Sequence, residues 1–265
     1  MKKVNVIILR TAGTNCDKET AFAFRLAGAD TQLVHINELT NRTKDLDSYH
    51  ILAIPGGFSY GDDIASGKIL ANELKFNLSS AMQRFIGCGK PIIGICNGFQ
   101  ILVKAGFLPN LGGDFRHIEA TLTLNDSDRF EDRWVYLKRP KTRCIWTKGI
   151  DKTIELPVAH GEGKFIPRDK GTLKRLKDEG LVALEYVDKN GRTAGYPYNP
   201  NGSVKNIAGI CDRTGRVFGL MPHPERHVTS LQHPNWTRRL RHLSDRKGDG
   251  FAIFKNGVEF AKKSL

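Results

Sequence analysis

The first half of the chain alternates short apolar runs with longer segments whose apolar residues recur every three or four positions. The short runs predict strands and the periodic segments predict helices. Strands are predicted at 4–9, 31–36, 51–54 and 91–95, and helices at 17–29 and 69–86. The run at 51–54 carries no polar residue on either face, which is typical of a central strand in a parallel sheet. This alternation predicts an α/β fold in which helices flank a doubly wound, mostly parallel sheet.

Beyond about residue 112 the pattern changes to shorter segments in which apolar and polar residues alternate. Such alternation predicts a small antiparallel β patch. Its strands are expected at 119–124, 133–137 and 181–187, followed by a last strand at 216–221 and an amphipathic helix at 249–261. No internal repeat or low-complexity linker interrupts the chain. We therefore expect one domain over residues 1–265, with surface insertions near 126–148 and 235–248.

The composition is that of a globular protein with a sizeable core. Hydrophobic residues make up 40% of the 265 positions, and no apolar run approaches the ~20 residues that a membrane span requires. The amino-terminal apolar run is too short for a signal peptide and ends at Arg10. Five cysteines are scattered without a C-x-x-C pair, at positions 16, 88, 96, 144 and 211. These features predict a cytoplasmic protein with neither a disulfide framework nor a cysteine-rich zinc site. No metal site is expected.

The positive charge is unevenly distributed. Residues 1–128 carry as many acidic as basic side chains, so the net charge of +13 lies wholly in residues 129–265. A basic half can bind nucleic acid, a phosphorylated ligand or an acidic protein. A solvated, highly charged surface is the simpler interpretation. Aromatic residues do not alternate with the basic ones, as a single-strand binding platform would need, so nucleic-acid binding is not favoured.

The segment 94–100, Gly-Ile-Cys-Asn-Gly-Phe-Gln, joins a predicted strand to a predicted helix. Glycines on both sides of Cys96 permit a turn too tight for side chains, which is the cysteine form of a nucleophile elbow. The amino terminus of the following helix would stabilise a thiolate at Cys96. A small hydrophobic residue that ends a core strand is the alternative interpretation of this cysteine. A nucleophile also requires a base and groups that stabilise developing charge.

His223 is the strongest candidate for that base. It follows a predicted strand and lies between two prolines, and Glu225 follows two positions later. This spacing lets a carboxylate hydrogen-bond the imidazole and fix its orientation. Gly56 and Gly57, at the end of another predicted strand, can present bare backbone N–H groups to an oxyanion. Taken singly, an H-x-E pair or a Gly-Gly turn would be an ordinary loop feature, and the combination with Cys96 favours the chemical interpretation.

These elements, in this order, resemble the class I (triad) glutamine amidotransferases. Six segments resemble one branch of that family, the glutaminase subunits of phosphoribosylformylglycinamidine synthase in purine biosynthesis. They are RTAGTNCD from residue 10, PGGFSYGDD from 55, GICNGFQIL from 94, AHGEGKF from 159, YPYNPNGS from 196 and GLMPHPERH from 219. The resemblance spans nearly the whole chain. It implies an enzyme that hydrolyses L-glutamine through a thioester and delivers the ammonia to an ATP-dependent synthetase, which converts formylglycinamide ribonucleotide to the amidine.

The resemblance also implies roles for individual residues. Cys96 would be the nucleophile, His223 the general base and acid, and Glu225 the residue that orients His223. The remaining assignments concern substrate and oxyanion binding: Gly57 and Asn97 would offer backbone N–H groups, Gln100 would help to bind glutamine, and His160 would line the same pocket.

The resemblance further implies that the partners are the synthetase subunit and a small accessory subunit. No Walker-type phosphate loop occurs in this sequence. We therefore expect no cofactor in this chain, with ATP and Mg²⁺ on the synthetase. Two rival functions stay open at this point. One is another cysteine-elbow α/β hydrolase, and the other is a non-enzymatic module whose basic half binds RNA or an acidic protein.

Overall fold

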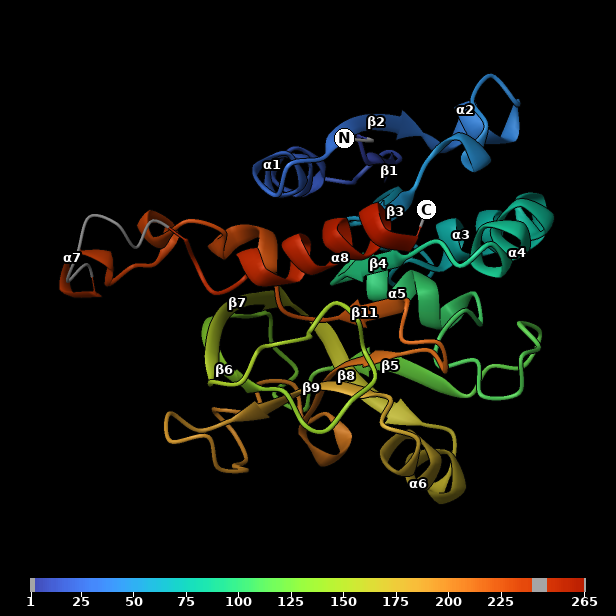
Figure 1. Cartoon of the computed structure of the whole chain (residues 1–265). Helices are drawn as coiled ribbons and strands as arrows, with labels where there is room; N and C mark the ends of the chain where they lie inside the picture. The colour runs from blue at the N-terminus through green and yellow to red at the C-terminus, as the bar shows by residue number, and fades with distance from the viewer. Residues whose placement is uncertain (1–2, 240–246, 265) are drawn as a thin grey trace.

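The computed structural model describes residues 3–239 and 247–264. A sheet of nine strands in the order β2-β1-β3-β4-β11-β10-β9-β6-β7 runs through the molecule (Figure 1). Its first five strands are parallel: β1 (Asn5–Arg10), β2 (Asp30–His35), β3 (Ile51–Ile54), β4 (Ile92–Ile95) and β11 (Val217–Leu220). The other four are antiparallel to their neighbours: β6 (Glu131–Lys138), β7 (Ile154–His160), β9 (Val182–Val187) and β10 (Ile207–Cys211). The predicted α/β class with a parallel sheet is confirmed.

A separate sheet of two antiparallel strands, β5 (Ala120–Leu124) and β8 (Glu162–Pro167), lies beside the large one. The predicted small antiparallel patch therefore exists, but it contains only the first of its three expected strands. The strands predicted at 133–137 and 181–187 belong to the large sheet as β6 and β9. Because β6 lies within 126–148, that part of the expected surface insertion is not a surface loop. The second expected insertion, 235–248, lies partly outside the described residues.

Helices cover both faces of the parallel strands. The helices are α1 (Asp17–Leu26), α2 (Ile36–Thr40), α3 (Lys68–Asn72), α4 (Ser79–Gly87), α5 (Asn97–Lys104), α6 (Lys170–Asp178), α7 (Trp236–Arg239) and α8 (Phe251–Ser264). Helices α1 and α8 pack together on one face through Phe24 and Phe254, whose ring centroids are 5.0 Å apart. Helices α3 and α5 pack on the other face. No described helix is both long enough and apolar enough to cross a bilayer.

The prediction of one long helix at 69–86 is wrong in one respect. The chain forms α3, then a π-helical turn at Glu73–Asn77, and starts α4 only at Ser79. Leu78 leaves helical geometry at φ −115°, ψ 13°. Its neighbours Asn77 and Ser79 favour helix ends because their side chains compete for backbone hydrogen bonds. The apolar period continues through the break, since both Leu74 and Leu78 are buried.

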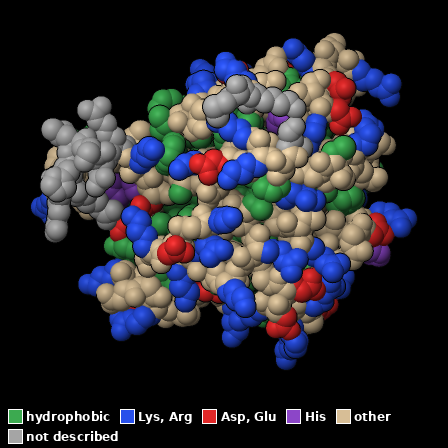
Figure 2. Space-filling view, viewed as in Figure 1, with side chains coloured by type: hydrophobic (Ala, Val, Ile, Leu, Met, Phe, Trp, Pro, Cys, Tyr) green, Lys and Arg blue, Asp and Glu red, His purple; other side chains and the backbone are tan. Residues whose placement is uncertain are grey.

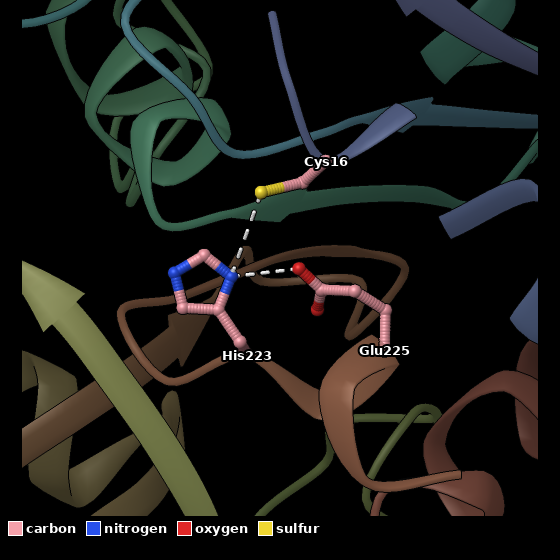
Figure 3. Close-up of side chains that lie close together, drawn as sticks. All are labelled: Cys16, His223 and Glu225. Carbon is pink, nitrogen blue, oxygen red and sulfur yellow. Dashed lines mark hydrogen bonds and ion pairs between the residues drawn. The ribbon is translucent and has the colours of Figure 1, made fainter. Parts of the chain in front are cut away.

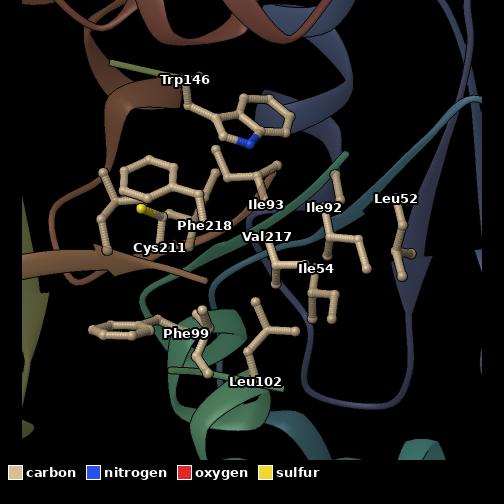
Figure 4. Packing of buried hydrophobic residues seen from close by; sticks show 14 of the residues in the cluster. Leu52, Ile54, Ile92, Ile93, Phe99, Leu102, Trp146, Cys211, Val217 and Phe218 are labelled. Atoms are coloured by element: carbon tan, nitrogen blue, oxygen red, sulfur yellow. The ribbon is translucent and has the colours of Figure 1, made fainter. Parts of the chain in front are cut away.

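The core extends over both halves of the large sheet. Strands β3 and β4 are buried along their whole length, as expected for parallel strands covered on both faces. Figure 4 shows Phe99 and Leu102 of α5 on one side of these strands and Trp146 on the other. One continuous cluster of buried residues includes strands from both halves, which supports the hypothesis of a single domain over 1–265.

On the face seen in Figure 2, the basic residues of the described part of the chain are distributed rather than gathered in one groove. Figure 2 shows Lys and Arg side chains scattered over the viewed face with acidic groups between them, and they are densest in the lower part, where α6 lies. Two basic residues of α6 pair with carboxylates at its end, Lys174 with Asp178 and Arg175 with Glu179, the residue that follows the helix. This arrangement fits the interpretation of a solvated, highly charged surface.

Candidate active site

Cys96 lies at the turn between β4 and α5, in a conformation that few residues other than glycine adopt. Its backbone has φ 51° and ψ −106°, a strained geometry that persists only where the surroundings enforce it. The amide of Cys96 donates to Leu220 O at 2.8 Å, and its carbonyl accepts from Phe99 and Gln100. The predicted elbow is therefore present. Strain of this kind is characteristic of a nucleophile turn.

Two glycines allow α5 to approach the sheet closely enough to hold this turn. A Cβ on Gly98 would lie 1.9 Å from Ile54 O, and a Cβ on Gly94 would lie 2.5 Å from Gly98 O. No larger residue fits at either position without backbone movement. The sequence G-x-C-x-G is thus required by the packing of the helix on β3 and β4 as well as by the turn itself.

His223 and Glu225 follow β11 and form a buried pair. His223 Nδ1 lies 2.7 Å from Glu225 Oε1, and the two side chains are 2% and 0% exposed. The His223 amide donates to Pro157 O at 2.8 Å, which ties this turn to β7. Burial lowers the pKa of His223, but the charges of Glu225 and then Cys96 raise it, and the pKa of His223 stands well above its ordinary value.

Cys96 and His223 meet over Gly56. A Cβ placed on Gly56 would lie 2.9 Å from His223 Cε1 and 3.4 Å from Cys96 Cβ. Both side chains line one cavity of ≈ 130 Å³, and the buried His223 Nε2 makes no hydrogen bond with the described residues. Because Nδ1 faces Glu225, Nε2 is the atom left for proton transfer at Cys96. The chain thus brings together a thiol, an imidazole and a carboxylate in the order that nucleophilic catalysis requires.

Gly57 and Asn97 lie next to Cys96 on two different elements. Gly57 has φ 136° and borders the cavity, and a Cβ there would lie 2.7 Å from Asn15 N. Asn97 is the first residue of α5, so its N–H has no acceptor within the helix. These positions suit the two backbone donors that the sequence predicts for an oxyanion, and their role stays a prediction.

The side chain of Asn97 does not face the cavity but connects its walls. Its Oδ1 accepts from Ser59 Oγ at 2.7 Å, and its Nδ2 donates to Gln100 Oε1 at 3.0 Å. Gln100 Nε2 donates in turn to Glu162 O at 2.6 Å. Gln100 lines the cavity as expected, but both ends of its amide are already bonded within the protein. This geometry favours a positioning role for Gln100 over direct contact with a substrate.

His160 is the last residue of β7 and also lines the cavity. It is 3% exposed, and its Nδ1 lies 3.1 Å from Asn125 Oδ1. Burial, followed by the positive charge of His223, lowers the pKa of His160 to about 3. His160 is therefore neutral at physiological pH, and it adds no second positive charge beside His223.

The site contains residues to which the sequence analysis gave no role. Cys16, just before α1, has its Sγ 4.0 Å from His223 Nδ1 and 3.3 Å from Arg226 Nη2. Burial raises the pKa of Cys16 to about 11, although His223 lowers it in part. A signal for Cys16 was available, because its segment follows the carboxyl end of β1. Parallel strands place their carboxyl ends, and hence their ligands, at one edge of the sheet.

Comparisons with known proteins identify the class to which this fold and site belong. The family described as CobB/CobQ-like glutamine amidotransferase domain matches residues 3–261. Similar curated proteins are named phosphoribosylformylglycinamidine synthase subunit PurQ. One from Dehalococcoides mccartyi is 49% identical over 99% of this chain and 100% of the relative. One from Methanococcus maripaludis is 43% identical over 97% of both.

A solved structure described as PurLQS from Thermotoga maritima matches with a TM-score of 0.73 and 29% identity, covering 98% of this chain and 99% of the other. A GMP synthase-like protein from Thermoplasma acidophilum, 16% identical over 99% of this chain and 96% of the other with a TM-score of 0.57, shares the fold. The chain therefore belongs to the glutamine amidotransferase family and, within it, to the PurQ subunits of phosphoribosylformylglycinamidine synthase. The resemblance found in the sequence motifs is confirmed.

Proposed function

We propose that this chain hydrolyses L-glutamine at Cys96 and supplies the ammonia to a synthetase subunit in purine biosynthesis. The synthetase would use ATP and Mg²⁺ to convert formylglycinamide ribonucleotide to formylglycinamidine ribonucleotide. We expect no cofactor in this chain and a cytoplasmic location. The observation that carries the proposal is the strained Cys96 elbow beside the buried His223–Glu225 pair. Full-length relatives named as PurQ subunits support the assignment of the substrate and the pathway.

In the first half of the reaction, Cys96 Sγ attacks the carboxamide carbon of glutamine. The oxyanion that forms would accept hydrogen bonds from the backbone N–H groups of Gly57 and Asn97. His223 holds the proton taken from the thiol, and it returns that proton from Nε2 to the departing ammonia. Glu225 keeps Nδ1 bonded throughout, so the ring presents Nε2 to the reacting atoms.

In the second half, water attacks the thioester and His223 acts as the base that accepts its proton. Glutamate leaves and the Cys96 thiol is restored. The surrounding residues keep the reacting groups in position. The hydrogen bonds from Ser59 to Asn97 and from Asn97 to Gln100 hold the two sides of the oxyanion site together. Neutral His160 closes the cavity wall without competing for the negative charge at Cys96.

The partners are proposed from the same comparisons. The similar solved structure is described as PurLQS, and we propose that this chain likewise assembles with a synthetase subunit and with a small accessory subunit. Because free release of ammonia is wasteful, and such sites are commonly completed by closure, we expect the isolated chain to be a poor glutaminase. Adding the two partner subunits should raise its rate.

A diazo-ketone analogue of glutamine tests the proposal, with the complex incubated and its peptides mapped by mass. Label is expected on Cys96 alone. The exposed Cys88 and the buried Cys16 serve as internal controls for general thiol reactivity. The variant Cys96→Ser should take up no label and release no ammonia. Label on a different cysteine, or none in the complete complex, would contradict the proposed function.

A further inference from the structure

A second thiol lies beside the catalytic imidazole, on its Glu225 side (Figure 3). Cys16 Sγ is 4.0 Å from His223 Nδ1, and Nδ1 is 2.7 Å from Glu225 Oε1. One ligand atom from each of the three residues lies within 4.8 Å of the others. Thiolate sulfur, imidazole nitrogen and carboxylate oxygen are the three donor types that zinc binds in proteins.

The ligand atoms are presented by fixed parts of the fold. Cys16 is 1% exposed and its amide donates to Gly56 O, while His223 and Glu225 occupy the short turn after β11. The second carboxylate oxygen, Glu225 Oε2, is buried and makes no hydrogen bond with any described residue. An unpartnered buried oxygen is costly. Because it belongs to the carboxylate whose other oxygen bonds His223 Nδ1, within reach of a thiol, it points to a ligand that the catalytic pair alone does not provide.

The charges around the site are compatible with a bound cation. With no cation bound, the raised pKa of Cys16 keeps it as a thiol, so binding a divalent cation must release the thiol proton to water. Arg226 Nη2, 3.3 Å from Sγ, can donate to the thiolate that results, and its Nε remains bonded to Glu19. The carboxylate of Glu225 and the thiolate together neutralise the two charges of the cation.

We propose that Cys16, His223 and Glu225 form an inhibitory site for a thiophilic divalent cation such as Zn²⁺. The cation takes the lone pair of His223 Nδ1 in place of the hydrogen bond to Glu225 Oε1, so Nδ1 releases its proton to water and the neutral ring carries its remaining hydrogen at Nε2. In that state Nε2 cannot accept the proton of Cys96. The site departs from the expectation of no metal in this chain, because the three ligands come from segments far apart in the sequence.

The cavity offers the cation a route to these residues, since Cys16 and His223 both line it. A fourth coordination position can be filled from the cavity side. Binding of the cation to these three residues does not require that their proposed catalytic roles be correct. The inhibition rests on the proposed function, since it requires His223 to act at Cys96.

Binding is tested with Co²⁺, which reports thiolate ligation through a sulfur-to-metal charge-transfer band. The protein is the purified chain carrying Cys96→Ser, so that the nucleophile cannot supply the sulfur. We expect the band in this variant and in the variant that also carries Cys88→Ser, which removes an exposed thiol. Adding Cys16→Ser should abolish it, as should Cys16→Ala, a second variant in case the first folds poorly. Absence of the band in Cys96→Ser, or its persistence without Cys16, overturns the site.

Inhibition is tested on the assembled complex through glutamine hydrolysis with increasing Zn²⁺. Loss of an outer contact alone weakens metal sites by about 10–100-fold. Cys16→Ser should therefore raise the inhibitory Zn²⁺ concentration by more than about tenfold, while Cys88→Ser leaves it unchanged. Chelation should restore activity, and Mg²⁺ should not inhibit. A cobalt band without inhibition by Zn²⁺ would overturn the inhibitory role alone, whereas failure of Cys96 labelling would overturn the proposed function and leave the metal site standing.

Discussion

His223 Nδ1 and Glu225 Oε1 are 2.7 Å apart in a part of the protein where neither side chain is more than 2% exposed. A charge pair at this distance interacts far more strongly away from water than on a surface. The carboxylate and the charge of Cys96 together stabilise the imidazolium enough to outweigh the cost of burial, and the pKa of His223 rises well above its ordinary value. The same contact fixes the ring orientation that leaves Nε2 for Cys96.

Glu225→Gln should lower the pKa of His223, because the amide keeps a hydrogen-bond acceptor but removes the negative charge. Departure of ammonia needs protonated His223, so activity falls as pH rises through the pKa of His223. The alkaline limb of the glutaminase pH profile should accordingly move to lower pH in the variant. The maximal rate should fall by roughly 10²–10⁴-fold. The measurement is the pH dependence of kcat/KM in the complex, and an alkaline limb that stays in place would contradict this account of the pair.

Gly56→Ala should disable catalysis with little loss of stability. The added methyl would lie 2.9 Å from His223 Cε1 and 3.2 Å from Cys16 Sγ, with Cys96 Cβ in ordinary contact at 3.4 Å, so the imidazole must move relative to Cys96. A displacement near 1 Å at reacting groups can cost about 10²-fold in rate. Gly112→Ala is the matched control, because nothing lies within 4 Å of its added methyl. Equal activity in the two variants, measured with the same partners, would mean that Gly56 does not govern the approach of the two side chains.

Asn97→Ala should lower both stability and kcat. It leaves buried Ser59 Oγ and Gln100 Oε1 without their Asn97 partners, and each buried polar group left unpaired costs about 1–3 kcal/mol. Because the lost contacts connect α5 to the loop that carries Gly57, we expect kcat to fall more than KM rises. Asn77→Ala is the control, since it removes an exposed side-chain bond to Glu73. Urea unfolding and steady-state kinetics measure the two effects, and a loss of stability without a loss of kcat would limit Asn97 to a structural role.

Much of the parallel half of the fold follows from local apolar patterns. The predicted strand 51–54 coincides with β3 (Ile51–Ile54), and the strand at 91–95 contains β4 (Ile92–Ile95). Local pattern was insufficient where pairing is decided at long range. The segment at 133–137 alternates in the manner of a small patch, yet β6 lies between β9 and β7 in the large sheet. Alternation fixes which face of a strand is buried, but it does not specify which strand is its neighbour.

The residues of the site also divide into those with a local sequence signal and those placed only by long-range packing. Cys96, His223 and Glu225 could be proposed from the sequence because each residue lies in a turn with its own local signature. Cys16 could not be placed beside His223 from its own turn, because their contact depends on the lateral order of β1, β3, β4 and β11 in the sheet. The hydrogen bond of the Gln100 side-chain amide likewise depends on Glu162, which belongs to a different element, strand β8.

His160 should make the protein less stable as pH falls from about 6.5 toward 5. Its pKa is about 3 in the folded state and near 6.5 in an unfolded chain, so within this window the unfolded state binds a proton that the folded state does not. The free energy of unfolding then falls by up to about 1.4 kcal/mol per pH unit. His223, whose pKa is raised, contributes in the opposite direction at higher pH: its stabilisation is complete below about pH 6.5 and is lost as the pH rises. Toward pH 5 the stabilisation by His223 is complete, so the slope there carries the contribution of His160 and none from His223.

His160→Gln should flatten that slope, because glutamine takes up no proton and can still face Asn125. The measurement is urea unfolding at intervals between about pH 5 and about pH 7, the range in which an unfolded histidine titrates. His117→Gln, which removes an exposed histidine, is the control and should keep the wild-type slope. If His160→Gln also kept the wild-type slope, the buried imidazole would not be the group that resists protonation. The conclusion that His160 is neutral beside His223 would then be wrong.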